Sequence, residues 1–326
     1  MKLAVLLDPV HQLKPYKDTS VAMIKSAKAL GWSCVYFTQL DLFCREGHPY
    51  ARVYDIDIGD EHSDNWAQSN ELGEYPLSDF DIILMRKDPP FDMEYIYTTY
   101  ALELAERDGV LVANRPQSLR DANEKFFTLN FSQCCPTTLV SQDIERLKEF
   151  WQTHKNVIFK PLEGMGGRSV FHVDQHGRNL SVILETLTQG QKLNIMAQRY
   201  IPEIATVGDK RILLINGEPI PYALARIPAK GELRGNLAAG ARGEVVPITA
   251  RDRWICEQIA PTLKAKGLYF VGIDVIGDYL TEINVTSPTC LREIAAETGI
   301  DIAGDYLRCL ADIRCNRSRN GVNLRN

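Results

Sequence analysis

Two carboxylates and one amide lie close together between positions 274 and 284, and all three offer oxygen to a metal ion. They are Asp274, Glu282 and Asn284. The apolar and β-branched residues around them predict a hairpin of two strands. If a three-residue loop at 277–279 joins the strands, Asp274 lies opposite Glu282, and Asn284 lies on the same face two residues further on. Such an oxygen set suits Mg²⁺, which completes its shell with water and phosphate oxygens.

The register of this hairpin tests the metal hypothesis. A two-residue turn would place Asp274 and Glu282 on opposite faces of the sheet, because side chains alternate along a strand. A second interpretation needs no metal: arginines would neutralise both carboxylates, which are costly to bury unpaired. We favour the metal, because acidic residues are rarely buried inside apolar strands.

A glycine-rich loop follows a predicted strand at 156–160 that ends in Lys160. The loop contains Gly164, Met165, Gly166 and Gly167. Glycines let backbone N–H groups converge on a phosphate, and a nearby ammonium group adds positive charge. The order differs from the Walker and dinucleotide-binding patterns, because the lysine precedes the glycines. Taken alone, the loop is equally compatible with a simple hairpin whose lysine faces solvent.

Four basic residues flank these two features: Lys125, Arg211, Arg226 and Arg234. Each one alone is most often a surface or salt-bridge residue. If they converge on a phosphoryl group, they stabilise the charge that develops during its transfer. The sequence shows no Ser-His-Asp arrangement and no metal-ligand spacing of histidines, so it indicates no protein nucleophile.

Length and composition limit the kind of protein. A chain of 326 residues predicts two or three compact units with a cleft between them. The net charge of −5 argues against a nucleic-acid partner. No apolar run is long enough for a membrane span or a secretory signal, and the cysteines show no metal or redox spacing. We therefore expect a cytoplasmic protein with reduced thiols.

The first part of the chain alternates apolar runs with amphipathic stretches, as a parallel α/β sheet requires. We predict helices that begin near Asp18 and Asp92 and a small doubly wound domain around them. Residues 41–79 are strongly acidic, so we expect a solvated, partly irregular excursion there. The predicted strands are 3–7, 33–38, 81–86 and 110–113.

The later part of the chain changes to hairpins after a helical pattern at 123–132. Asn216-Gly217 predicts a turn between strands at 210–215 and 219–226. Residues 228–247 are rich in glycine and charge, and a loop of that length is typical of a lid. The tail from Cys315 is predicted to fray. Further predicted elements are a strand at 137–140, a hairpin at 268–285, and helices at 143 onward, 251–266, 291–297 and 302–314.

Together these motifs resemble the ATP-grasp ligases and, within them, the prokaryotic glutathione synthetase family. The resemblance runs from the strand before Asp8-Pro9 to about Ala311. The most diagnostic stretches are ILMRKDPPFD at 83–92, NRPQSLRD at 114–121, KPLEGMGG at 160–167, LARIP at 224–228, RGNLAAG at 234–240 and TEINVTSPT at 281–289.

The resemblance implies a fold, a set of domains and a reaction. The fold is α/β, with an N-terminal doubly wound parallel-sheet domain followed by a two-lobed ATP-grasp fold with antiparallel sheets. In the implied reaction, ATP phosphorylates the cysteinyl carboxylate of γ-glutamylcysteine, and glycine displaces phosphate to give glutathione. Mg²⁺, or Mn²⁺ in its place, accompanies ATP. The implied parts are a substrate-binding domain at 1–122, a central lobe at 123–200, a C-terminal lobe at 201–314 with the lid 228–247, and a flexible tail at 315–326.

The resemblance also implies a role for each site residue. Asp274, Glu282 and Asn284 hold the metal. ATP contacts are Lys125, Lys160, Gly164, Met165, Gly166, Gly167, the adenine edge Gln198, Arg199, Tyr200 and Ile201, and Asp209 near the ribose. Arg211, Arg226 and Arg234 are catalytic. The candidates for substrate carboxylates are Arg86, Ser287, Thr289 and Arg292.

Two other functions stay open at this stage. Another ATP-grasp ligase, joining an amino acid to a peptide, would keep the phosphate and metal residues but leave the 85–90 segment unexplained. A nucleotide-binding scaffold without turnover is disfavoured by the intact Glu282 and Asn284. The resemblance implies small-molecule substrates and is compatible with a homotetramer. The sequence leaves the glycine pocket, the order of substrate addition and the resting position of the lid undetermined.

Overall fold

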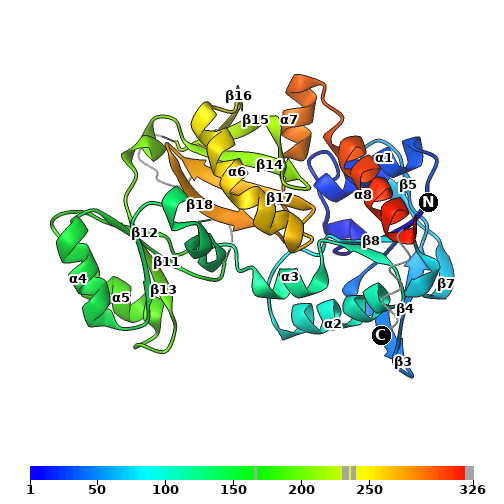
Figure 1. Cartoon of the computed structure of the whole chain (residues 1–326), viewed down its shortest axis with the longest axis horizontal. Coiled ribbons are helices and arrows are strands. Elements are labelled where there is room, and N and C mark those ends of the chain that lie inside the picture. Colours follow the sequence, from blue (N-terminus) through cyan, green and yellow to red (C-terminus); the bar gives the residue numbers. More distant parts are fainter. Residues whose placement is uncertain (165–166, 230–234, 236–239, 320–326) are drawn as a thin grey trace.

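The computed structural model describes residues 1–164, 167–229, 235 and 240–319. Figure 1 shows an elongated molecule with a small lobe at one end, a central sheet, and the N-terminal sheet at the other end. The predicted mixed α/β fold with antiparallel sheets in its later part is confirmed. No helix among the described residues is long and apolar enough to cross a membrane.

The N-terminal sheet has a parallel centre. Its strands β1 (Lys2–Leu6), β2 (Ser33–Phe37), β8 (Ile82–Met85) and β9 (Leu111–Ala113) pair in parallel in the order β2-β1-β8-β9. Asp18 and Asp92 cap α1 (Thr19–Ala29) and α2 (Met93–Arg107), since each side chain accepts a hydrogen bond from a backbone N–H of the first turn. The predicted helices and strands of this region are therefore confirmed.

The acidic segment is partly irregular, as predicted, because residues 59–66 lie in no strand or helix, but the strands around them were not predicted. The N-terminal sheet is extended by β3 (Leu42–Arg45), β4 (His48–Tyr54) and β7 (Glu71–Pro76), while β5 (Asp57–Ile58) and β6 (Ala67–Gln68) pair with each other in a separate two-stranded sheet. β4 alternates buried Ala51 and Val53 with exposed or half-buried residues, and its partners β3 and β7 are antiparallel. Acidic residues sit on the solvent side of such strands, which is why their density did not exclude a sheet.

The small lobe is a four-stranded antiparallel sheet, whose order is β10 (Thr138–Ser141), β13 (Ile195–Arg199), β11 (Val157–Pro161) and β12 (Phe171–Val173). Two helices, α4 (Ile144–His154) and α5 (Leu180–Thr188), pack on it around a core that includes Leu147, Phe159 and Leu184. The segment before the lobe is the 3-10 helix η4 (Phe126–Cys134), kinked at Phe131, instead of the regular helix predicted. Lys125 lies in the turn that precedes it.

The central sheet is five-stranded and antiparallel. It runs in the order β16 (Arg242–Pro247), β15 (Glu218–Ile227), β14 (Asp209–Ile215), β17 (Phe270–Ile276) and β18 (Tyr279–Asn284). The predicted Asn216-Gly217 turn is confirmed, and both residues have positive φ, as the favoured two-residue hairpin turn requires. The predicted loop 228–247 is wrong at its end, because β16 pairs with β15 there. Residues 230–234 and 236–239 of that loop lie outside the described residues.

Three helices complete this part of the chain: α6 (Ala250–Ala265), α7 (Leu291–Thr298) and α8 (Ile302–Arg319). α8 packs against α1 and continues past the predicted end. The prediction that the chain frays from Cys315 is therefore wrong as far as Arg319. Within this last part of α8, Arg317 donates to the Tyr269 hydroxyl at 2.8 Å. The remaining short elements are α3 (Pro116–Asp121) and the 3-10 turns Val10–Gln12, Gln39–Asp41, Leu77–Asp79 and Pro202–Ala205.

Candidate active site

A cleft of about 410 Å³ lies between the small lobe and the central sheet. Strands of both sheets line it, and Asp88 and Pro89 reach it from the N-terminal sheet. Met165, Gly166 and Arg234 lie outside the described residues. Most of the predicted site residues line the cleft: Lys125, Lys160, Gly164, Gly167, Gln198, Arg199, Tyr200, Ile201, Asp209, Arg211, Arg226, Asp274, Glu282, Asn284, Ser287 and Thr289.

The acidic hairpin has the predicted pairing but not the predicted turn. Asp274 pairs with Glu282, whereas Ile276 pairs with Tyr279, so the turn has two residues. The register shifts between these two pairs, because Thr281 is an extra residue in a β-bulge. Without the bulge, Thr281 would occupy the position opposite Asp274, and Glu282 would face the other side of the sheet. The Thr281 hydroxyl also donates to the Asp274 carbonyl at 3.1 Å.

Asp274 is held by two arginines, as the interpretation without a metal anticipated. Arg211 donates to both of its carboxylate oxygens, at 2.5 and 2.9 Å, and Arg226 Nη2 lies 3.0 Å from Oδ2. Burial opposes the charge of Asp274, but the two guanidinium groups outweigh it and hold its pKa well below the ordinary value. Asn284 Nδ2 lies 3.4 Å from Asp274 Oδ2, which places the amide on the same face.

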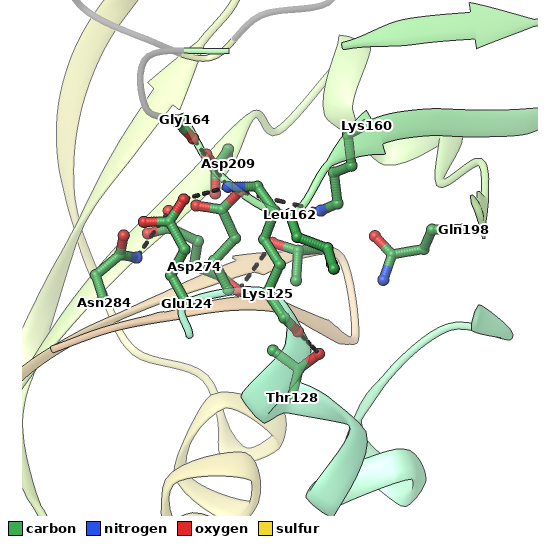
Figure 2. A network of polar contacts seen from close by, with 12 residues as sticks. Glu124, Lys125, Thr128, Lys160, Leu162, Gly164, Gln198, Asp209, Asp274 and Asn284 are labelled. Atoms are coloured by element: carbon green, nitrogen blue, oxygen red, sulfur yellow. Dashed lines mark hydrogen bonds and ion pairs between the residues drawn. The ribbon is translucent and has the colours of Figure 1, made fainter. Parts of the chain in front are cut away.

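Glu282 faces two lysines from other parts of the chain. Lys125 Nζ lies 3.6 Å and Lys160 Nζ lies 4.0 Å from its carboxylate. Burial lowers the pKa of Lys160, and Glu282 acts in the opposite direction. Lys125 also donates to the carbonyl of Gly164 at 3.0 Å, so it ties the glycine-rich loop to this cluster (Figure 2). Oxygen and nitrogen groups from three separate segments therefore meet at one point in the cleft.

Glu124 belongs to this cluster although the sequence did not indicate it. Its carboxylate pairs with Lys125, and burial followed by repulsion from Glu282 raises its pKa. A glutamate beside a lysine is common on any surface, so no local signal could have identified it. Among the described residues, no three His, Cys, Asp or Glu side chains are arranged to hold a metal by themselves.

Asp209 lies at the lid side of the cleft. It pairs with Arg226, and a Cβ added to Gly235 would lie 3.0 Å from the Asp209 Cβ. Burial raises the pKa of Asp209 to about 7, against the opposite effect of Arg226. Its Oδ1 atom is buried and has no hydrogen-bond partner among the described residues. A free buried acceptor of this kind suits a ligand hydroxyl.

The other end of the cleft is largely apolar. Its wall includes Ile158, Val170, Ile201, Ile204 and Ile276. The rings of His172 and Tyr200 stack there with centroids 4.2 Å apart. His172 carries no signal in the sequence that would select it, because its short strand β12 was not predicted. A flat aromatic ligand fits such a surface, with the charged cluster at the opposite end.

The structure does not bring Arg86 and Arg292 to the cleft. Arg86 is buried and donates to the Ser20 hydroxyl and to the Pro288 carbonyl, both at 3.1 Å. Arg292 donates to the carbonyl of Pro15 at 2.7 Å and to Glu61 at 2.5 Å. These contacts use two of the five N–H donors of each guanidinium group, and neither arginine lines the cleft. Ser287 and Thr289, the other two candidates, do line the cleft.

Comparisons with known proteins agree with this geometry. The family model described as the prokaryotic glutathione synthetase N-terminal domain matches residues 1–120, and the ATP-grasp domain model of the same family matches residues 124–307. Glutathione synthetase from Pseudomonas aeruginosa is 55% identical over 294 residues, covering 90% of this chain and 92% of that protein. The Escherichia coli enzyme is 52% identical over 297 residues, covering 91% and 93%.

Solved structures with low sequence identity share the fold. D-cycloserine synthetase DcsG has a TM-score of 0.68 at 12% identity, with 96% of this chain and 100% of that chain covered. The ATP-grasp ligase PsnB has a TM-score of 0.60 at 16% identity, with 96% and 98% covered. From the two family models and the close relatives, this chain belongs to the prokaryotic glutathione synthetase family.

Proposed function

We propose that this cleft joins γ-glutamylcysteine to glycine at the expense of ATP, giving glutathione, ADP and phosphate. Membership of the family makes the chain an ATP-dependent ligase of glutathione synthesis. One observation carries the assignment to this cleft: Lys125 and Lys160 converge on Glu282 while Arg211 and Arg226 converge on Asp274. Four positive side chains this close to two carboxylates suit phosphoryl transfer.

The two ends of the cleft give ATP an orientation. The apolar end with the His172–Tyr200 stack suits the base, and the unpartnered Asp209 Oδ1 suits a ribose hydroxyl. Lys125 and Lys160 would then contact the phosphates, with the glycine-rich loop 164–167 above them. This loop and the lid at 228–247, with Arg234, would exclude water, which would otherwise hydrolyse the acyl phosphate.

The donor set fits a divalent metal ion that shares phosphate oxygens. Two carboxylates and one amide are hard oxygen ligands, and they are too few to hold an ion alone, as is common for Mg²⁺ with nucleotides. We assign Asp274, Glu282 and Asn284 as these ligands, with Mg²⁺ as the ion and Mn²⁺ as a substitute. When bound, the ion would neutralise charge on the phosphates.

The residues of the chain position two successive attacks. A carboxylate oxygen of γ-glutamylcysteine attacks the terminal phosphorus of ATP, and ADP leaves. The neutral amine of glycine then attacks the acyl carbon, and phosphate leaves as the peptide bond forms. Arg211 and Arg226 would hold the phosphoryl group in both steps and stabilise its developing charge. The substrate itself supplies the nucleophile, which agrees with the lack of a protein nucleophile in the sequence.

Ser287 and Thr289 are the proposed contacts of the peptide substrate. Gly272 places them beside the reacting groups, because a Cβ added to it would lie 2.9 Å from Arg211 Cδ and 3.0 Å from Pro288 Cβ. Arg211 and the 286–289 segment therefore approach the same point of β17, at Gly272. Arg86, which donates to Pro288 from behind, would support this segment instead of binding substrate.

Further parts of the assignment concern organisation. We propose domains at 1–122, 123–200 and 201–314, which the two family-model matches at 1–120 and 124–307 support. We also propose a homotetramer, to be measured by light scattering. A cytoplasmic location fits a reaction that consumes ATP and a free thiol, since a reducing compartment preserves that thiol.

A substrate-omission assay tests the proposed function. The purified protein with Mg·ATP should release ADP and form glutathione in equal amounts only when γ-glutamylcysteine and glycine are both present. Other acid and amine pairs serve as controls. Faster ADP release with a different pair would indicate another ligase. Binding of Mg·ATP without ADP release on any pair would indicate a scaffold without turnover, and either result would overturn the proposal.

A further inference from the structure

One hydrogen-bond chain fixes the orientation of an amide in the cleft. The Thr138 hydroxyl donates its single proton to the Pro136 carbonyl at 2.8 Å. The same hydroxyl lies 3.1 Å from Gln198 Nε2, so at that contact it can only accept. An amide can present either its oxygen or its nitrogen, and its partners decide which. Gln198 must therefore turn its NH₂ group to Thr138, which leaves its oxygen on the other side.

Gln198 lies where a nucleotide base is expected. It is 4% exposed and lines the cleft. In the sheet it pairs with Ile158 of the apolar end, and Lys160 follows two residues along β11 on the same face. Figure 2 shows the Gln198 oxygen turned to the side on which Lys160 lies. The fixed acceptor thus belongs to the base end of the cleft.

We propose that Thr138 is a positioning residue that makes Gln198 select adenine nucleotides. The inference rests on the proposed function, because it takes the apolar end to hold the base of ATP. Adenine carries an exocyclic amine, whose N–H donates to an acceptor such as Gln198 Oε1. Hypoxanthine and guanine carry a carbonyl oxygen at the same position, which would face the Gln198 oxygen without a proton between them. A site that leaves polar groups unpaired in this way rejects the wrong ligand strongly.

Thr138 matters because a free amide could rotate. With no fixed partner, Gln198 could offer its NH₂ group to a carbonyl base as easily as it offers its oxygen to adenine. The hydroxyl of Thr138 could follow such a rotation only by giving up its bond to Pro136, so the rotated amide costs one hydrogen bond. Discrimination between bases therefore depends on a residue that need not touch the base.

The test compares ATP with inosine triphosphate (ITP), which differs from ATP at the decisive group. The measured quantity is the ratio of kcat/KM for ATP to kcat/KM for ITP, with γ-glutamylcysteine and glycine saturating. We expect Thr138→Val to lower this ratio about tenfold, because the variant loses the one hydrogen bond that orients the amide. The change should appear in the KM values for ATP and ITP. Thr138→Ser keeps the hydroxyl and should keep the ratio.

A second variant separates this role from a general effect on folding. Gln198→Met removes the amide, and it should lower the ratio to about the level of Thr138→Val, with no further loss in the double variant. An unchanged ratio in Thr138→Val, or additive losses in the double variant, would overturn the inference. Equal use of ATP and ITP by the unmodified protein would also overturn it, while the proposed ligase activity would stand.

Discussion

The two walls of the cleft are built differently. The small lobe has its own core of residues such as Leu147, Phe159 and Leu184, and its helices and strands pack mainly on one another. The central sheet shares its core with the N-terminal sheet, since Ile273 belongs to the same buried cluster as Leu6. Figure 1 shows the same division, with the small lobe at one end of the molecule.

The chemistry divides along the same line. The central sheet, which is the anchored wall of the cleft, carries the arginine pair and Asp274, and their proposed part in phosphoryl transfer requires accurate positions. The separate lobe carries Gln198 and Lys160, the proposed contacts of the nucleotide. On this proposal, the lobe with its independent core moves as a unit to admit ATP and then closes, while the groups proposed to react stay fixed to the 286–289 segment.

The largest effect is expected at the point where the two walls meet. Glu282→Gln should lower kcat by about a hundredfold or more, because it removes charge at a phosphoryl-transfer site. ADP release measures kcat, and thermal melting checks that the fold is kept. Glu257→Gln, at an exposed position of α6, is the matched control and should have normal activity. Normal turnover of Glu282→Gln would remove this residue from the site.

The independence of the small lobe predicts an uneven loss of stability. Leu184→Ala should destabilise the small lobe by about 2–5 kcal/mol, because it opens a cavity in a fully buried core. Limited proteolysis should then cut first within 138–199, while the N-terminal sheet stays protected. Ile273→Ala, in the shared core, should expose both the central and the N-terminal sheets. The same cleavage pattern for both variants would contradict the division into two walls.

The anchored wall predicts a selective change in substrate binding. Arg86→Lys should raise the KM for γ-glutamylcysteine about fivefold to tenfold. Arginine donates to Ser20 and Pro288 from two nitrogens of one planar group, whereas lysine has a single nitrogen that cannot reach both partners in that geometry. The KM for ATP should stay unchanged. Arg107→Lys, at an exposed position of α2, is the control. An equal rise in both KM values would mean that Arg86 supports the whole fold and not the 286–289 segment.

The last effect concerns the pH dependence of stability at Asp209. Burial raises its pKa from 3.8 to about 7, so the folded state binds this proton more tightly than the unfolded state. The contribution of Asp209 to stability therefore falls as pH rises from about 4 to about 7, and stays level above that range. Urea titrations at several pH values should show this fall in the unmodified protein and a weaker one in Asp209→Asn. A parallel profile in both would show that another group titrates.

Local signals explain why much of the fold was predictable. Asp18 and Asp92 at helix starts and Asn216-Gly217 between apolar runs each act within a few residues, so the sequence alone identifies them. The proposed metal and phosphate residues could be selected for a similar reason, since their types and spacing are unusual inside apolar strands. Strands β3, β7 and β16 were missed, because each depends on pairing with a distant partner.

The roles of several residues could only follow from packing. Thr281 has no special sequence signal, yet as the bulge residue it decides which face Glu282 occupies. Arg86 lies in a diagnostic motif, but its partner Pro288 is 202 positions away, so its buried contact with the 286–289 segment could only follow from packing. His172 and Glu124 enter the cleft through neighbours that no short window of sequence contains.

The sequence by itself indicated which residue types and spacings could carry the chemistry: Lys160 before a glycine-rich loop, the oxygen set on the acidic hairpin, and the family motifs. It could do so because residue type and short-range spacing are written directly in the chain. Only the tertiary structure decided that Lys125 and Lys160 face Glu282, and that Arg211 and Arg226 hold Asp274. Those contacts join distant segments: strand pairing within the central sheet sets the arginine contacts, and the packing of other segments against that sheet sets the lysine contacts.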